Sequence, residues 1–145
     1  MGQRTKIGFT AGAFDLMHAG HVLMFKDCKK VCDYLIVALQ EDPSVDREWK
    51  NKPIMSLEER KILLESLKYI DEIVVYKTEK DLFKILSKMK FDVRIIGSDW
   101  EGKKYTGYFL KHHEHYFHRR THGYSSSELR ERVYTKEHER RNTNK

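Results

Sequence analysis

Two histidines, His18 and His21, lie three positions apart where an apolar run gives way to a helical pattern. At the start of a helix, this spacing places both rings on one face of the first turn, beside free backbone N–H groups and the positive end of the helix dipole. Gly12 permits close backbone approach to a ligand, and Gly20 leaves the space between the rings clear. We therefore predict a site for a polyphosphate whose α-phosphorus is attacked there.

The residues around this pair resemble a known signature. The letters HAGH at 18–21 match the HxGH signature of the nucleotidyltransferase superfamily, and GAFDLMHAGH at 12–21 is similar to the GxFDxxHxGH form of the cytidylyltransferases. The resemblance implies that both histidines are catalytic and donate hydrogen bonds to α-phosphate oxygens in the transition state. It also implies nucleotide contacts from Ala13, Phe14, Asp15 and Gly20. Asp15 either organises the histidine turn or binds a metal-bound water, and the sequence leaves both open.

Basic residues follow in a loop at 40–55 and in the helix after it. In the cytidylyltransferases, a lysine-bearing loop stands here, ahead of a helix with an E-x-x-R-like pattern that the letters EER ending at Arg60 resemble. Lysines neutralise β- and γ-phosphates as mobile point charges, so both Lys50 and Lys52 are candidates for catalysis. Arg60 and Lys68 are candidates for binding the acceptor. Lys68 opens the segment KYIDE, which resembles RYVDEV of the family, and it keeps the charge of arginine without its bidentate fork.

The segment GSDWEGK at 97–103 resembles the GDDWEGK string of the cytidylyltransferases that act on glycerol 3-phosphate, with Ser98 in place of an aspartate. The resemblance implies that Asp99 accepts hydrogen bonds from the cytosine amino group or from a ribose hydroxyl. A polar turn at the end of a strand is the alternative.

The segment RTHGYSSS at 120–127 resembles the RTxGxSTT signature of the family. The implied chemistry is a phosphate site at a helix N-terminus. Arg120 would stabilise the departing pyrophosphate, and nucleotide contacts are implied for Thr121, Ser125 and Ser126. The alternative for Ser125 is a plain N-cap.

These segments cover roughly residues 6–135 and imply transfer of CMP from CTP to a phosphorylated alcohol, with glycerol 3-phosphate as the best candidate acceptor. The acceptor oxygen is already an anion at pH 7, so catalysis consists of positioning and charge neutralisation. Mg²⁺ would bridge the triphosphate, and no protein ligand for a metal is identified. An adenylyltransferase of the same superfamily (FAD-synthase-like) and a catalytically silent nucleotide-binding module remain alternatives.

Strand and helix patterns alternate along the chain. Apolar runs predict strands at 6–11, 34–39, 72–76, 93–97 and 113–117. Apolar spacing and capping boxes predict helices at 21–31, 56–69, 78–89 and 125–134. This alternation predicts an α/β fold, a Rossmann-like three-layer sandwich with a parallel central sheet of about five strands and a site beyond the strands' carboxyl ends. We divide the chain into a nucleotidyltransferase domain, 1–135, and a charged C-terminal tail, 136–145.

Composition limits the remaining possibilities. No apolar run reaches the roughly 20 residues of a membrane span, and the N-terminus lacks the apolar stretch of a signal peptide, so we expect a cytoplasmic protein without a membrane partner. The net charge of +6 is explained by a pocket for an anionic substrate, and we expect no nucleic-acid partner. A homodimer is expected from the resemblance, and apolar loop residues at Tyr105, Tyr108 and Phe109 support an interface or a lid.

A group of histidines near the C-terminus suggests a metal site at first sight. We prefer a solvated edge strand, because no HExxH pattern and no cysteine accompanies the group. Its members are His112, His113, His115, His118 and His122.

Overall fold

Five parallel strands form the central sheet of the computed structural model, which describes residues 4–144. The strands lie in the order β3-β2-β1-β4-β5, and every neighbouring pair is parallel. From β1 the chain builds outward to β3 and then continues on the other side of β1, so the order reverses between β1 and β4. Open α/β sheets bind ligands beyond the carboxyl ends of their strands at such a reversal. The bounds are β1 Ile7–Gly12, β2 Tyr34–Gln40, β3 Glu72–Tyr76, β4 Val93–Gly97 and β5 Glu114–His118.

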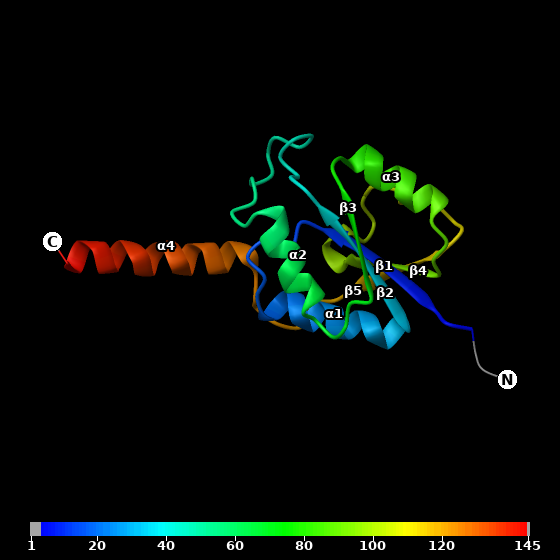
Figure 1. The fold of residues 1–145 in the computed structure, drawn as a ribbon, viewed down its shortest axis with the longest axis horizontal. Helices are drawn as coiled ribbons and strands as arrows, with labels where there is room; N and C mark the ends of the chain where they lie inside the picture. Colours follow the sequence, from blue (N-terminus) through cyan, green and yellow to red (C-terminus); the bar gives the residue numbers. More distant parts are fainter. Residues whose placement is uncertain (1–3, 145) are drawn as a thin grey trace.

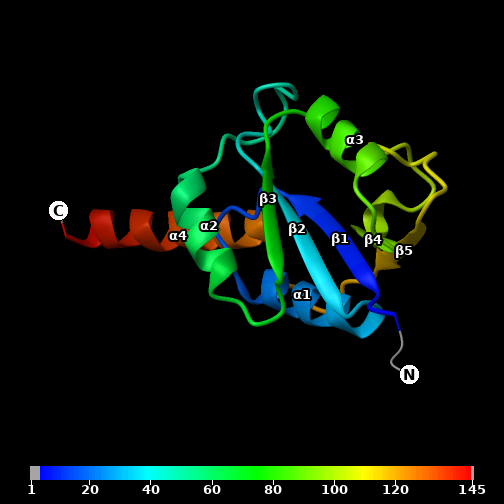
Figure 2. The same ribbon diagram turned by 45° about the vertical axis from the view of Figure 1, so that its right-hand side comes forward.

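Helices cover both faces of this sheet (Figure 2). On one face lie α1 (Ala19–Val31) and α2 (Leu57–Glu65), whose buried side chains share a core with β2. On the other face lies α3 (Glu79–Lys88), where Leu86 packs in a second core with Phe9 of β1. The predicted three-layer α/β sandwich with a parallel sheet of five strands is confirmed.

The observed strands agree with the predicted ones to within one residue at each end, whereas the helix ends differ more. Helix α1 begins two residues earlier than predicted, at Ala19. Helix α2 ends at Glu65 rather than near Tyr69. Leu67 and Tyr69 still pack against the core, so apolar spacing continues after the helix has ended. A short 3₁₀ turn, η1 (Ser98–Trp100), follows β4.

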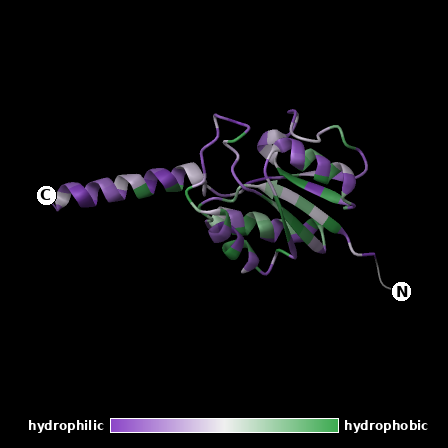
Figure 3. Ribbon diagram, turned by 45° about the horizontal axis from the view of Figure 1, so that its top comes forward, coloured by the Kyte–Doolittle hydropathy of each residue, from purple (hydrophilic) through white to green (hydrophobic). Residues whose placement is uncertain are grey.

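Helix α4 (Ser126–Thr143) extends away from the body of the domain (Figure 1). It is hydrophilic over most of its length (Figure 3), and none of its residues is buried. Glu137 pairs with Arg140 at 2.6 Å and with Arg141 at 2.9 Å, and such pairs one turn apart support an exposed helix. Within the predicted charged C-terminal tail, residues 136–143 are therefore helical.

The histidine-rich strand β5 is less exposed than predicted. It is an edge strand, but His113, which directly precedes it, is only 8% exposed, and both ring nitrogens of His113 are buried without a hydrogen-bond partner among residues 4–144. The ring of His115 bonds on both sides, to the hydroxyl of Tyr105 and to the carbonyl of Leu110, each at 2.7 Å. The prediction of a solvated strand is wrong because the preceding loop folds back over these rings. Among the described residues, no group of three or more His, Cys, Asp or Glu side chains is arranged to hold a metal ion.

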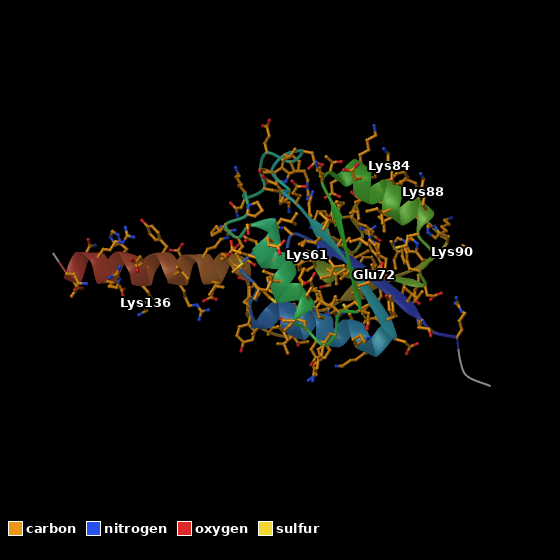
Figure 4. The ribbon with its side chains drawn as sticks, in the orientation of Figure 1. Lys61, Glu72, Lys84, Lys88, Lys90 and Lys136 are labelled. Atoms are coloured by element: carbon orange, nitrogen blue, oxygen red, sulfur yellow. The ribbon has the colours of Figure 1, made fainter. Side chains whose placement is uncertain are left out.

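Much of the positive charge lies on the outer surface. Figure 4 labels lysines on α2, α3 and α4 and just after α3, and none of them lines either of the cavities described below. They are Lys61, Lys84, Lys88, Lys90 and Lys136. Among the described residues, no helix combines the length and the apolar character needed to cross a membrane.

Candidate active site

His18 and His21 form the N-terminal cap of α1. The Nδ1 of His18 accepts a hydrogen bond from the backbone N–H of Gly20 at 3.0 Å, and the Nδ1 of His21 accepts one from the backbone N–H of His18 at 3.1 Å. Because Nδ1 is the acceptor in both rings, the proton of each neutral ring lies on Nε2. The ring centroids are 4.0 Å apart. The cap therefore holds two Nε2–H donors side by side.

Both histidines are held in the neutral form. The pKa of His21 is lowered to about 4, mainly by burial and also by the neighbouring His18, against the opposing effect of Asp15. Burial also lowers the pKa of His18, with His122 and Arg120 as additional causes. At pH 7 each ring is therefore a neutral donor with a fixed tautomer. Fixed donors of this kind stabilise a phosphate oxygen on which negative charge increases in a transition state.

The turn that leads into α1 requires its glycines. A Cβ at Gly20 would lie 2.8 Å from the Cε1 of His18 and 2.8 Å from the Cε1 of His122, so glycine keeps the space between these two rings clear, whereas the sequence predicted this role between His18 and His21. Gly12 has another role than the predicted close approach to a ligand. A Cβ there would lie 3.1 Å from the Cζ of Phe14, because that ring covers it.

Phe14 adopts the left-handed backbone region with φ of 50°, and Leu16 does so with φ of 49°. Residues other than glycine rarely occupy this region, and such strain often accompanies functional sites. The conformation turns the Phe14 ring inward against Phe25, at 5.2 Å between centroids, and edge-on to His21, at 5.9 Å. Phe14 therefore supports His21 from beneath and lines neither cavity, unlike the nucleotide contact that the resemblance implied.

The two rings line a first cavity of about 210 Å³. The N-termini of α1 and α4 meet there, with the Nε2 of His18 3.2 Å from the Oγ of Ser126. Ser125 caps α4 by accepting a hydrogen bond from the N–H of Glu128 at 3.0 Å. Two helix N-termini that face one cavity favour an anion. The lining residues are His18, Gly20, His21, Met24, Gly97, Ser98, Asp99, His118, Arg120, His122, Tyr124, Ser125 and Ser126.

A second, larger cavity of about 620 Å³ adjoins the first, and Met24 and Gly97 line both. It lies between the carboxyl ends of the strands, the start of α3 and the loop after β4. Of the residues singled out in the sequence for ligand contacts, Gly12, Ala13 and Lys50 line it, and so does Tyr105, which was expected at an interface or a lid. Its other polar lining residues are Thr10, Gln40, Arg47, Tyr76, Glu79, Arg94, Lys104 and Thr106, and its lining includes both Trp49 and Trp100.

Comparison with known proteins identifies the family. Residues 9–132 match the family model described as Cytidylyltransferase-like. The chain belongs to this family. It is 34% identical over 125 residues to a glycerol-3-phosphate cytidylyltransferase from Bacillus subtilis (strain 168). The aligned region covers 86% of this chain and 94% of that protein. It is also 40% identical over 103 residues to the bifunctional protein HldE from Wolinella succinogenes, covering 70% of this chain but only 22% of that protein.

Two solved structures are similar to this chain. The lipopolysaccharide core biosynthesis protein from Thermoplasma volcanium GSS1 superposes with a TM-score of 0.65 at 25% identity, covering 83% of this chain and all of that one. A pantoate-beta-alanine ligase from Francisella tularensis superposes with a TM-score of 0.57 at 18% identity, covering 88% of this chain and 63% of that one. The second likeness shows a shared fold only.

Within this cytidylyltransferase-like chain, Asp15 binds other parts of the protein. Its carboxylate accepts hydrogen bonds from the backbone N–H groups of Ile54 and Met55, each at 2.9 Å, and pairs with Arg130 at 2.9 Å. It therefore ties the histidine turn to the end of the 40–55 loop and to α4. Of the two roles that the sequence left open, this geometry matches the organising one, and the implied nucleotide contact gains no support.

Arg60 is also engaged by the protein itself. It is 1% exposed and donates to four backbone carbonyl oxygens, those of Ala13, Gln40, Glu41 and Met55. The acceptor-binding role predicted for it is contradicted, because this burial leaves no surface for a substrate. Arg60 instead anchors the loop that carries Lys50. Its carbonyl partners lie just after β1, at the end of β2 and just after it, and shortly before α2.

Lys68 lies at the wrong edge of the sheet for its predicted role. It lies in the turn between α2 and β3. Three residues later, the N–H of Asp71 donates a hydrogen bond to the carbonyl of Leu35 near the start of β2, so this turn lies at the amino ends of the strands. Both cavities lie at the opposite, carboxyl edge, so within one chain Lys68 cannot bind the acceptor there. Lys52 and Thr121 line neither cavity, whereas Lys50, Asp99 and Arg120 do.

Several cavity residues were not singled out as site residues in the sequence. His118 ends β5, and His122 follows it, so both were considered only as members of the histidine group. Arg94 sits inside an apolar strand pattern, where a lone charge usually indicates a surface position, and Arg47 lies in an irregular loop. The available signal was the position of His118 and Arg94 in strands whose carboxyl ends point to the site.

Proposed function

We propose that this chain transfers CMP from CTP to a phosphorylated alcohol and releases pyrophosphate. The observation that carries this proposal is the pair of Nε2–H donors held by the cap of α1, in a cavity where a second helix N-terminus also ends. Glycerol 3-phosphate is the first acceptor to test, because the relatives that match over 94% and 95% of their length, from Bacillus subtilis and Staphylococcus aureus, are glycerol-3-phosphate cytidylyltransferases.

The reaction follows from the positions of the donors. An oxygen of the acceptor phosphate attacks the α-phosphorus of CTP and forms a new phosphorus–oxygen bond. The bond from the α-phosphorus to the oxygen that bridges to the β-phosphorus breaks, and pyrophosphate leaves with that electron pair. His18 and His21 donate their Nε2–H groups to the α-phosphate oxygens. Because both are neutral and aligned before the reaction, they stabilise the transition state without transferring a proton.

The leaving group faces the N-terminus of α4. Arg120 and the hydroxyl of Ser126 line the first cavity beside His18, and the N-terminal N–H groups of α4 add partial positive charge. Lys50, from the neighbouring cavity, supplies a mobile charge for the phosphates. Asp99 is the only carboxylate of the first cavity among the described residues, and it is free to accept from the cytosine amino group or a ribose hydroxyl.

We propose Mg²⁺ as the cofactor, carried by the triphosphate. The donors present fit this mode because Asp15 is fully engaged and the described residues form no metal-binding cluster. Mg²⁺ typically keeps several waters and binds through substrate phosphates with one or two carboxylates, and among the described residues that line the first cavity Asp99 carries the carboxylate. When bound, the ion supplies charge neutralisation of the triphosphate.

A pyrophosphate-release assay tests the function. Purified protein is given CTP, ATP, GTP or UTP with Mg²⁺ and a panel of phosphorylated acceptors that includes glycerol 3-phosphate. We expect release with CTP that depends on the acceptor, and a CDP-alcohol product by mass spectrometry. Faster release with ATP would favour the adenylyltransferase alternative. If folded protein releases no pyrophosphate with any of these nucleotides and acceptors, the result would favour the catalytically silent module.

We also propose that the protein acts in the cytoplasm as a homodimer. Tyr108 and Phe109 are 43% and 57% exposed, and they contact each other at 5.4 Å between ring centroids. Tyr105, the third aromatic residue of this loop, instead turns inward to His115. Light scattering should give about twice the 17.4 kDa chain mass, and a Phe109→Ser change should shift it toward the monomer. A monomer at micromolar concentration would leave Tyr108 and Phe109 as lid residues.

A further inference from the structure

Arg94 is a buried cation without an anionic partner. It is 6% exposed, and no carboxylate of residues 4–144 forms an ion pair with it. Its guanidinium donates to the carbonyl oxygen of Thr106 and lies over the ring of Tyr105, 5.1 Å from the centroid. Burial of a charge is costly unless the charge is paired and hydrogen-bonded. Arg94 lines the second cavity, so the missing partner can come from a ligand.

The nearest acidic group does not fill that place. Glu79 pairs with Arg47 at 2.7 Å and accepts a hydrogen bond from the hydroxyl of Thr106 at 2.9 Å. The Nε of Arg47 is itself buried without a partner among the described residues. The cavity is thus lined by four cationic side chains, Arg47, Lys50, Arg94 and Lys104, against one carboxylate that is already engaged. Such a lining favours an anionic ligand.

The position of Arg94 separates it from the site of transfer. It pairs with Phe9 in the middle of the sheet, three residues before Gly97, which borders both cavities. At about 3.3 Å per residue, its backbone lies roughly 10 Å from that border. An acceptor whose phosphate reaches the α-phosphorus at the border therefore extends its other end toward Arg94. The cavity of about 620 Å³ is of the size that encloses larger ligands than a three-carbon phosphate.

We propose that Arg94 binds a second anionic group of the acceptor, a carboxylate or a further phosphate, distant from the phosphate that attacks CTP. This inference rests on the proposed function, since it assigns the second cavity to the acceptor of that reaction. The guanidinium presents a planar fork that suits either anion. Arg94 is then a specificity-determining residue, and the acceptor is a phosphorylated sugar acid or a related doubly anionic alcohol.

Matched acceptor pairs test this assignment. Glucose 1-phosphate is compared with glucuronic acid 1-phosphate, and glycerol 3-phosphate with 3-phosphoglycerate, because each pair differs only by a carboxylate in place of a hydroxymethyl group. We expect kcat/KM to favour the acid by roughly tenfold or more in at least one pair. In Arg94→Gln that ratio should fall to about one, through the KM of the acceptor, while the KM for CTP stays unchanged. Arg94→Lys should recover part of the preference.

Lys84→Gln is the control, because this lysine lies on the outer side of α3 (Figure 4) and should leave the ratio unchanged. A wild-type preference for the neutral member of both pairs would overturn the proposal. So would an acid preference that survives in Arg94→Gln. If Arg94 only holds the Thr106 carbonyl, the Gln variant lowers the melting temperature and leaves the ratio as it was.

A binding measurement separates this proposal from the proposed function. The chain has two tryptophans, Trp49 and Trp100, and both line the second cavity. Titration of glucuronic acid 1-phosphate and 3-phosphoglycerate without CTP should change their fluorescence in a saturable way, with roughly tenfold weaker binding to folded Arg94→Gln. If no acceptor supports transfer but this titration succeeds, the transferase assignment fails and the anion site stands. Equal binding to wild type and Arg94→Gln, or no binding of either acid, overturns the anion site.

Discussion

At the scale of single residues, His18 uses its two ring nitrogens for different purposes. In His18, Nδ1 caps the helix through the N–H of Gly20, and Nε2 faces the cavity beside Ser126. The cap fixes the ring, the tautomer and the direction of the free donor at once. Structure and chemistry therefore depend on different atoms of one side chain, and substitutions can separate them.

His18→Asn should separate these two roles. The amide oxygen of asparagine can take the place of Nδ1 as a helix cap, but no donor replaces Nε2–H. We expect a melting temperature close to that of the wild type and a loss of turnover of about 10²–10³. His18→Ala should lose the same activity and also about 1 kcal/mol of stability. Calorimetry and steady-state kinetics on both variants check this, and near-normal turnover in His18→Asn would remove Nε2 from the mechanism.

The buried His113 should make the fold sensitive to mild acid. Its pKa is lowered from 6.5 to about 4, mainly by burial and in addition by its neighbours His112, His115 and Arg94. Above pH 6.5 the ring is neutral in both folded and unfolded chains, so it has no effect on stability. Between pH 6.5 and 4 the unfolded chain takes up the proton first, so stability falls as the pH decreases, by roughly 1–2 kcal/mol at pH 5.

His113→Phe tests this dependence, because the ring of His113 makes no hydrogen bond that phenylalanine would lose. Urea unfolding at pH 7.5 and pH 5.0 should show a smaller loss of stability in the variant than in the wild type. His21, whose pKa is also about 4, keeps its own contribution in both proteins. An identical pH dependence in both would mean that His113 is solvated in solution.

Local motifs explain which site residues the sequence could predict. His18, Gly20, His21, Ser125 and Ser126 line the first cavity, and the sequence could point to them because each motif lies within a single helix turn, at the start of α1 or of α4. The assignments of Asp15 and Arg60 were less successful, because each is engaged by backbone or side-chain groups far away in the chain, such as Arg130 for Asp15. Sequence spacing does not reveal such partners.

At the scale of elements, strands were easier to predict than helix ends. A strand buried on both faces is a short continuous apolar run, so its limits are visible in the sequence. Helix α2 ends at Glu65 although apolar residues continue to pack against the core at Leu67 and Ile70, because the N–H groups of these two residues donate to the carbonyl three residues back rather than four. Helix α4 continues past Tyr134 although its outer part has no apolar face, because ion pairs and good helix formers sustain it.

The outer part of α4 should be dispensable for the isolated domain. The side-chain hydrogen bonds and ion pairs found for residues 136–144 all stay within the helix. A chain that ends at Thr135 should keep its melting temperature within about 2 °C and its turnover, since exposed pairs contribute little. Arg130→Ala is the matched contrast. It removes the partner of Asp15 and should cost about 1–2 kcal/mol. Loss of activity in the shortened chain would assign a function to the projecting helix.

At the scale of the whole molecule, the site brings together one segment near the start of the chain and one near its end. Helix α1 begins at Ala19 and helix α4 at Ser126, and the contact between His18 and Ser126 spans 108 positions of the chain. A nucleotide bound between these helix N-termini connects elements that few other contacts join. Binding should therefore stabilise the global fold, and unfolding should report nucleotide preference before any acceptor is known.

The last prediction concerns this stabilisation of the fold by a bound nucleotide. Free ligand at about 100 times its Kd adds about 2.7 kcal/mol to the stability of a one-site protein, which corresponds to a rise in Tm of about 5–10 °C for a domain of this size. We expect such a rise with CTP and Mg²⁺, and a clearly smaller one with ATP at the same concentration. Arg120→Gln should reduce the CTP effect, because it removes a guanidinium from the triphosphate site, whereas Lys88→Gln on the outer side of α3 should not. A larger shift with ATP would transfer the assignment to an adenylyltransferase, because the role proposed for His18 and His21 is the same for either nucleotide and only the contacts to the base would distinguish them.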